Sequence, residues 1–235
     1  MDQDKQRQAA AAAAAELVES GMVVGLGTGS TAAHFIEALI RRVKTEGLKI
    51  TAIPTSVRSE HQARTGGIRL VSFAAVQQLD LTIDGADQIE RGSLHLVKGM
   101  GGALLREKIV AVSSKRLVII ADSSKLVDRL AGKIPVPVEV VQFGWETTSA
   151  RIARLGGQPI LRWAKDSDQP VRTDSGNLIL DCIFPLLEDP AGLEQALSQT
   201  VGVVETGLFI GMADIALVAN SKGVKTLSRP RPPSG

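Results

Sequence analysis

The sequence predicts an α/β protein with an open, mostly parallel Rossmann-like sheet, helices on both faces of that sheet, and a smaller ferredoxin-like α+β domain. Short apolar segments alternate with helical segments up to about residue 131, which is typical of parallel sheets. After Gly132 the expected order changes to βαββαβ. We therefore assign residues 1–131 and 205–228 to the larger domain, 132–204 to the smaller domain and 229–235 to a flexible tail.

The composition narrows the class of protein. The 235 residues are 44% hydrophobic with a formal net charge of +2, which suits a compact globular chain. No basic run and no long apolar stretch is present, so we expect neither a nucleic-acid partner nor a membrane. The single cysteine, Cys182, predicts a buried thiol in a reducing compartment, which we take to be the cytoplasm. Histidine and cysteine show no metal-ligand spacing.

The first elements predict an anion-binding loop. A helix rich in alanine is expected over residues 4–19, and a buried strand over residues 22–26 leads through Gly27-Thr28-Gly29-Ser30-Thr31 into a helix over residues 32–44. Backbone N–H groups and the helix dipole at such a junction bind anions. A dinucleotide fingerprint would need glycine in place of Ser30, and a Walker A loop would need a Gly-Lys pair, so the loop fits one phosphate. The alternative is a plain tight turn.

The next elements end in a pair of aspartates. Strands are expected over residues 48–54 and 68–71, with a polar turn and helix from residue 55 between them, and a third strand over residues 79–83 ends in Asp84-Gly85-Ala86-Asp87. Open α/β sheets bind ligands just beyond the carboxyl ends of their strands, and paired carboxylates can divide acid and base roles. The alternative is an Asp-Gly turn in which Asp87 caps a neighbouring segment.

Residues 94–110 place a lysine, a glycine turn and a glutamate close together. Residues 94–97 are expected to end a buried strand, and a helix follows over residues 103–110. Because helical side chains tilt toward the helix N-terminus, Glu107 can lean over the turn Lys98-Gly99-Met100-Gly101-Gly102. This arrangement suits proton abstraction by the glutamate, with the lysine and N–H groups holding an oxyanion. The alternative is a solvated charged face of the helix.

A further strand over residues 116–120 leads to Lys125. If the sheet is parallel, the loops after four strands, including the one at residues 94–97, converge on one edge. They would then bring together the phosphate loop, two aspartates, two lysines and Glu107. This convergence predicts an active site.

The second half predicts the smaller domain. Strands are expected over residues 136–141, 158–163, 177–184 and 203–204, helices over 145–155 and 190–200, and a hairpin turn at residues 174–177. A strand over residues 215–219 would return the chain to the main sheet.

The assembled motifs resemble those of ribose-5-phosphate isomerase, type A. The matching segments occur in the order of that family: GLGTGSTAAHF at 25–35, DGAD at 84–87, KGMGGALLREKI at 98–109 and ADSSK at 121–125. The resemblance implies interconversion of D-ribose 5-phosphate and D-ribulose 5-phosphate through an enediolate, without metal or organic cofactor. It also implies a homodimer or a dimer of dimers.

The resemblance further implies a role for each matching residue. Glu107 would be the base that moves a proton between C2 and C1, and Lys125 would hold the substrate from the far side. Phosphate would bind Thr28, Gly29, Ser30 and Thr31. Sugar hydroxyls and ring opening would involve Asp84 and Asp87 with Gly85 and Ala86 between them, and the oxyanion would bind Lys98, Gly99, Met100 and Gly101.

Three positions depart from the family pattern. Met100 stands where glycine or arginine is frequent, Gln88 replaces a glutamate, and Arg7 stands where the first helix usually offers a lysine to the phosphate. Two other functions remain open from the residues: a sugar-phosphate sensor without chemistry, and an acyl-CoA transferase that also acts through a glutamate.

Overall fold

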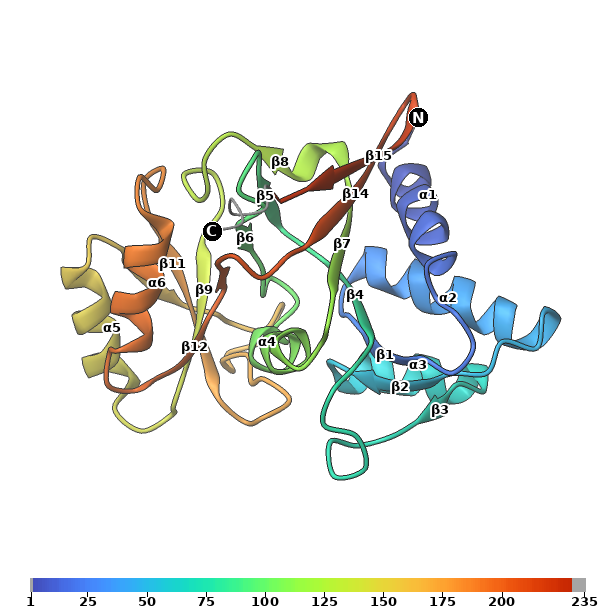
Figure 1. The fold of residues 1–235 in the computed structure, drawn as a ribbon. Helices are drawn as coiled ribbons and strands as arrows, with labels where there is room; N and C mark the ends of the chain where they lie inside the picture. The colour runs from blue at the N-terminus through green and yellow to red at the C-terminus, as the bar shows by residue number, and fades with distance from the viewer. Residues whose placement is uncertain (1, 230–235) are drawn as a thin grey trace, which may run out of the picture.

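The computed structural model describes residues 2–229, and within them a seven-stranded sheet forms the centre of the larger domain (Figure 1). Its order is β15-β14-β7-β4-β1-β2-β3, and every neighbouring pair is parallel except β14 and β15. The prediction of an open, mostly parallel sheet is therefore confirmed. The strands are β1 (Val23–Leu26), β2 (Thr51–Pro54), β3 (Arg69–Leu70), β4 (Leu81–Gly85), β7 (Leu117–Asp122), β14 (Ile215–Asn220) and β15 (Gly223–Ser228).

Both faces of this sheet are covered, because successive strand residues point to opposite sides. Val118 and Ile120 of β7 pack into the core formed with the first three helices, whereas Ile119 and Ala121 face the other side. Figure 1 shows α1 and α2 on one side of β7 and β14, and β5, β6 and β8 on the other. The helices of the larger domain are α1 (Gln3–Ala15), α2 (Ser30–Thr45), α3 (Val57–Gly66) and α4 (Leu104–Val112).

The smaller domain has the predicted βαββαβ order. Its antiparallel sheet runs β10-β11-β9-β12, and one face buries an apolar core against two helices. Cys182 is a buried free thiol in this core. Its last strand ends two residues beyond the boundary expected at residue 204. The elements are β9 (Val136–Val140), α5 (Trp145–Arg154), β10 (Gln158–Leu161), β11 (Leu178–Ile183), α6 (Pro190–Ser198) and β12 (Val203–Thr206).

A third sheet, which the sequence analysis did not predict, changes one expectation. Residues 94–97 do not end a strand of the parallel sheet, because Leu96 and Val97 pair antiparallel with β5 and β13. After Asp87 the chain turns back on itself, and Ile89 and Leu96 are buried against β7 and β14. The order is β13-β6-β5-β8, with β5 (Gln88–Glu90), β6 (Leu96–Val97), β8 (Leu126–Val127) and β13 (Leu208–Phe209).

The C-terminal part adds a strand that the sequence analysis also missed. β15 pairs antiparallel with β14 at the edge of the main sheet, and most of its residues are exposed, so it lacks a clear apolar alternation. The backbone N–H of Arg229 donates to the carbonyl of Asp214 at 3.3 Å. The rest of the predicted tail, residues 230–235, lies outside the described residues.

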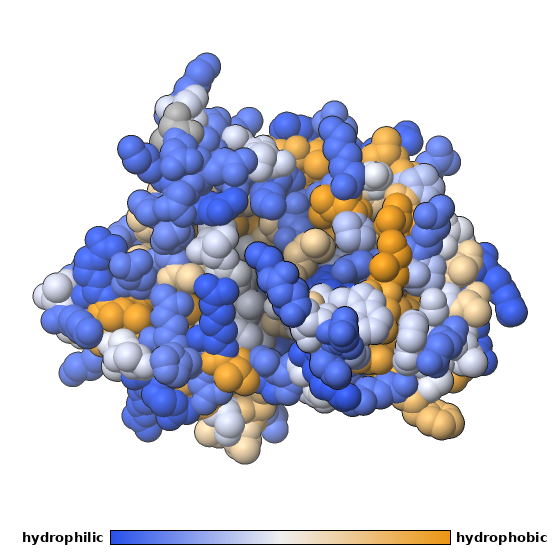
Figure 2. All heavy atoms as spheres, turned by 180° about the vertical axis from the view of Figure 1, so that it is seen from behind, coloured by the Kyte–Doolittle hydropathy of each residue, from blue (hydrophilic) through white to orange (hydrophobic). Residues whose placement is uncertain are grey.

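Apolar side chains gather unevenly on the surface. Seen from behind, the half of the molecule formed by the smaller domain carries the largest hydrophobic areas (Figure 2). Phe143, Ile160 and Leu186 are among the exposed apolar side chains of this domain. No helix within residues 2–229 has the length and apolar character needed to cross a bilayer.

Candidate active site

The predicted phosphate loop connects β1 to the N-terminus of α2. Gly29 precedes the helix with φ of +108°, a conformation that favours glycine. Gly27 is required for a different reason, because a Cβ there would lie 2.1 Å from Oδ1 of Asp84 and 2.6 Å from its Cα. The loop therefore lies directly against β4, with the first N–H groups of α2 unpaired within the helix and suited to an anion.

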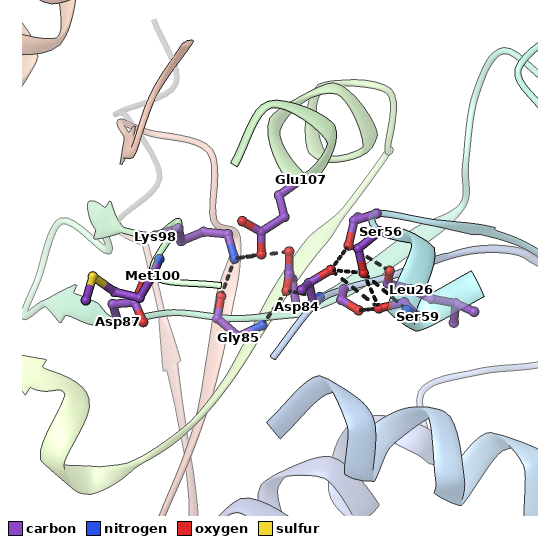
Figure 3. Close-up of polar contacts among 12 residues, drawn as sticks. Leu26, Ser56, Ser59, Asp84, Gly85, Asp87, Lys98, Met100 and Glu107 are labelled. Carbon is purple, nitrogen blue, oxygen red and sulfur yellow. Dashed lines mark hydrogen bonds and ion pairs between the residues drawn. The ribbon is translucent and has the colours of Figure 1, made fainter. Parts of the chain in front are cut away.

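A cluster of side-chain hydroxyl groups forms hydrogen bonds with this loop. Oγ1 of Thr28 lies 2.7 Å from Oγ1 of Thr55 and donates to Oγ of Ser56 at 2.8 Å. Oγ of Ser59 donates to the carbonyl of Gly27 at 2.6 Å (Figure 3). Thr55, Ser56 and Ser59 are not among the predicted site residues, although they follow β2 at the same edge of the sheet. The sequence signal for them is the run of polar residues that follows a strand of the parallel sheet.

Asp84 connects the phosphate loop to the lysine. Its Oδ1 accepts the backbone N–H of Thr28 at 3.0 Å and that of Gly85 at 2.7 Å, and its Oδ2 pairs with Nζ of Lys98 at 3.0 Å. Asp84 is 1% exposed and does not line the cavity. All of these contacts are made within the protein, and the expected contact of Asp84 with sugar hydroxyls stays a prediction.

Lys98 and Glu107 form a buried pair at the centre of the site (Figure 3). Nζ of Lys98 lies 3.1 Å from Oε1 of Glu107 and donates to the carbonyl of Gly85 at 2.5 Å. Lys98 is 2% exposed and Glu107 is 4% exposed. Burial lowers the pKa of Lys98, but the carboxylates of Asp84 and Glu107 outweigh burial and raise it, so the side chain remains an ammonium.

The electrostatic surroundings of Glu107 are those expected of a general base. Burial raises the pKa of its carboxyl group above the usual range, Lys98 opposes this, and the charges of Asp84 and Asp87 add to it. Among residues 2–229, Oε2 of Glu107 has no hydrogen-bond partner. A buried carboxylate with one unused oxygen and a raised pKa is suited to take a proton from a bound molecule.

The glycine turn between β6 and α4 lies beside this pair. Gly99 and Gly102 have φ of +103° and +79°, and the N–H of Met100 donates to Oδ2 of Asp87 at 3.0 Å. The Met100 side chain is 45% exposed and points away from Glu107 (Figure 3). Only the backbone of Met100 takes part in these contacts, which explains how this departure from the family pattern is tolerated.

Arg7 and Gln88, the other two departures, have different surroundings. Nε of Arg7 pairs with Oδ2 of Asp122 at 3.1 Å, and Arg7 lines the same cavity as the phosphate loop. Burial tends to raise the pKa of Asp122, but hydrogen bonds from Ser124 and Arg7 keep it below the usual range. Gln88 instead binds the backbone of Ala131, accepting its N–H at 2.7 Å and donating to its carbonyl at 3.2 Å. A glutamate could not make both contacts as an anion.

One cavity brings the predicted residues together, although the lysine turn reaches it from the third sheet rather than from the parallel one. Asp84 and Met100 are the predicted site residues that do not line it. The cavity is lined by Arg7, Thr28, Gly29, Ser30, Thr31, Gly85, Ala86, Asp87, Lys98, Gly99, Gly101, Glu107 and Lys125. Elsewhere, a larger groove of about 550 Å³ beside α4 is mainly apolar, with Ile53, Phe73 and Ile109 in its wall.

Comparison with known proteins gives a consistent result. The family model for ribose 5-phosphate isomerase A (phosphoriboisomerase A) matches residues 51–223. Ribose-5-phosphate isomerase A of Synechococcus sp. (strain JA-3-3Ab) is 55% identical over 224 residues, covering 95% of this chain and 97% of the relative. The corresponding protein of Gluconobacter oxydans is 51% identical over 224 residues, covering 95% and 96% of the two chains.

Solved structures agree over the whole fold. Ribose 5-phosphate isomerase A from Methanocaldococcus jannaschii superposes with a TM-score of 0.92 at 40% identity, covering 96% of this chain and 99% of the other. A D-ribose-5-phosphate isomerase in complex with phospho-erythronic acid superposes with a TM-score of 0.94 at 37% identity, covering 97% and 100%. The chain belongs to the ribose 5-phosphate isomerase A family.

Proposed function

We propose that the protein interconverts D-ribose 5-phosphate and D-ribulose 5-phosphate, a reaction of the non-oxidative pentose phosphate pathway, by proton transfer through an enediolate. The observation that carries this proposal is the unpartnered Oε2 of Glu107, buried beside Lys98 in the cavity that the phosphate loop lines. Membership of the isomerase A family supports the same substrates.

Each group has one task in this mechanism. The loop Thr28–Thr31 binds the phosphate, with positive charge from Arg7 and Lys125 on the cavity wall. Asp87 contacts the sugar and assists ring opening. Asp84 holds Lys98 and the loop in place.

The proton then moves within the substrate. Oε2 of Glu107 takes the proton from C2 of the open-chain aldose, and the electron pair of that bond forms the enediolate C1=C2 bond as O1 gains negative charge. Lys98 and the N–H groups of the glycine turn stabilise this oxyanion. The proton of the C2 hydroxyl passes to O1, and Glu107 returns its proton to C1 as the C2–O bond becomes the ketone carbonyl, so atoms and charge balance.

The test is an isomerisation assay with ribose 5-phosphate in D₂O, with and without a chelator. We expect turnover to survive the chelator and carbon-bound deuterium to enter the product, because the proton held on Glu107 can exchange with solvent before it returns to C1. Strict metal dependence without deuterium uptake would overturn the enediolate route. A sugar-phosphate sensor would bind ribose 5-phosphate without turnover, and an acyl-CoA transferase would form a glutamyl thioester with acyl-CoA.

We also propose that the protein acts in the cytoplasm as a homodimer or a dimer of dimers. The exposed apolar side chains of the smaller domain support self-association, because such surfaces mark contact sites (Figure 2). Sedimentation equilibrium would distinguish these states from a monomer.

A further inference from the structure

Arg162 extends from the end of β10 in the smaller domain to the glycine turn of the active site. Its Nε donates to Oδ2 of Asp181 at 2.8 Å and its Nη2 to Oδ1 at 2.5 Å. Asp181 lies on the neighbouring strand β11, so two adjacent strands hold the guanidinium group in a bidentate pair. This fork geometry fixes the plane of the arginine better than a single contact would.

The remaining nitrogen of Arg162 binds the turn itself. Nη1 donates to the carbonyl of Gly99 at 3.1 Å and to that of Met100 at 3.2 Å. One guanidinium group therefore fixes two consecutive peptide units. The carbonyl of Gly99 also accepts the N–H of Gly102 at 3.0 Å, which closes the turn.

These contacts determine where the N–H groups of the turn point. The C=O and N–H of a planar trans peptide point in opposite directions. In the first peptide the N–H of Met100 donates to Asp87, on the side away from Arg162. In the second, the N–H of Gly101 must also point away from Arg162, and it has no hydrogen-bond partner among residues 2–229. Gly101 lines the active-site cavity.

A turn composed mainly of glycine needs contacts from other segments to keep one conformation. Gly99, Gly101 and Gly102 have no side chains with which to anchor it, and glycine reaches many backbone conformations. Preorganised N–H groups stabilise an oxyanion only if they stay aligned without reorganisation.

We infer that Arg162, held by Asp181, is a positioning residue that aligns the N–H of Gly101, in the Lys98–Gly101 turn, with the enediolate oxyanion. The inference rests on the proposed isomerase function. It gives the smaller domain a part in the reaction although neither Arg162 nor Asp181 lines the cavity.

The test compares Arg162→Gln, Arg162→Lys and Asp181→Asn with wild type. We expect Arg162→Gln to lower kcat about 10- to 100-fold, because small misplacements near the reacting atoms have effects of this size. The KM for ribose 5-phosphate and the Kd for inorganic phosphate should stay within about 3-fold, since the phosphate loop does not contact Arg162. Affinity for phospho-erythronate, whose carboxylate stands in for the enediolate oxygens, should fall with kcat.

The other variants separate positioning from simple structural damage. Arg162→Lys should recover part of kcat, and Asp181→Asn, which leaves the arginine in place, should produce a smaller loss. Combining Asp181→Asn with Arg162→Gln should add no further loss, because both act through one contact. Arg129→Gln is the control, since it makes the same substitution in an exposed arginine–carboxylate pair, in which Nη1 of Arg129 lies 3.8 Å from Oε1 of Glu188.

Two results would overturn the inference. One is a wild-type kcat in folded Arg162→Gln protein, and the other is an equal loss of phosphate and phospho-erythronate affinity. Absence of isomerisation by the wild-type protein would instead count against the proposed function, so the two failures are distinguishable.

Discussion

The ammonium of Lys98 lies 3.1 Å from Oε1 of Glu107, and both side chains are almost completely buried. A buried ion pair depends on both members, because removal of one leaves the other charge without compensation. Lys98 also pairs with Asp84, so one ammonium compensates two carboxylates. Burial raises the pKa of Glu107, and Lys98, which is shared with Asp84, only partly offsets this rise.

Lys98→Met should lower kcat about 10²- to 10³-fold, because it removes a donor to the oxyanion. It should also move the acidic limb of kcat/KM to higher pH, since Lys98 is the cation that holds the pKa of Glu107 down. The pH–rate profile checks both effects. Lys115→Met is the control, because Lys115 is an exposed lysine paired with Asp80 at 2.8 Å. An unshifted acidic limb would show that Lys98 does not act on Glu107.

Glu107→Gln should lower kcat by about 10³-fold or more, because it removes the proposed base, whereas KM should change little. The amide keeps the size of the side chain and a hydrogen-bonding oxygen near Lys98. Steady-state kinetics and calorimetric titration of phosphate would separate turnover from binding. Near-normal turnover in this variant would remove Glu107 from the role of base.

Glu107→Gln should also change how stability depends on pH. The folded state raises the pKa of Glu107, so wild-type protein loses stability as pH rises from the unfolded pKa through the folded one. Glutamine does not titrate, so the variant should gain on wild type by about 1–3 kcal/mol across this window. Urea unfolding at several pH values measures the difference. Glu188→Gln, the same substitution at an exposed position, is the control.

Sequence reasoning found the parts of the site that follow strands of the parallel sheet. The loops after β1, β4 and β7 meet at one edge because the carboxyl ends of parallel strands lie together. The same rule would have identified Thr55 and Ser56 after β2. For the turn that begins at Lys98, the rule assigned the preceding strand, β6, to the wrong sheet. This strand has 2 residues, which is too short for an apolar pattern that would indicate which sheet it joins.

Other contacts had no signal in the sequence. Arg162 and Gly99 are separated by 63 positions, and Arg7 and Asp122 by 115. Neither local sequence pattern nor spacing identifies such hydrogen-bonded pairs, because the contacts depend on how the two domains and the first helix pack. β15 was missed for a simpler reason, because an exposed edge strand shows little apolar alternation.

Ser59→Ala should weaken phosphate binding rather than chemistry. It leaves the carbonyl of Gly27 without its hydroxyl donor, at a cost of about 1–2 kcal/mol, and lets the phosphate loop move. We expect KM to rise about 3- to 10-fold with kcat nearly unchanged. Ser198→Ala is the control, because the exposed Ser198 hydroxyl donates to Glu194, far from the phosphate loop in the sequence. A fall in kcat at constant KM would contradict this role.

Arg7 lines the cavity and also pairs with Asp122, so it can serve either the substrate or Asp122. Arg7→Gln should raise KM about 10-fold through loss of a charged phosphate contact, and added salt should reduce the difference from wild type. Arg7→Lys should keep KM within about 3-fold, since a lysine ammonium is also a phosphate ligand. Lys5→Gln is the control, as an exposed lysine on the same helix. If Arg7→Gln binds phosphate as wild type does, but unfolds more easily, then Arg7 acts only by pairing with Asp122.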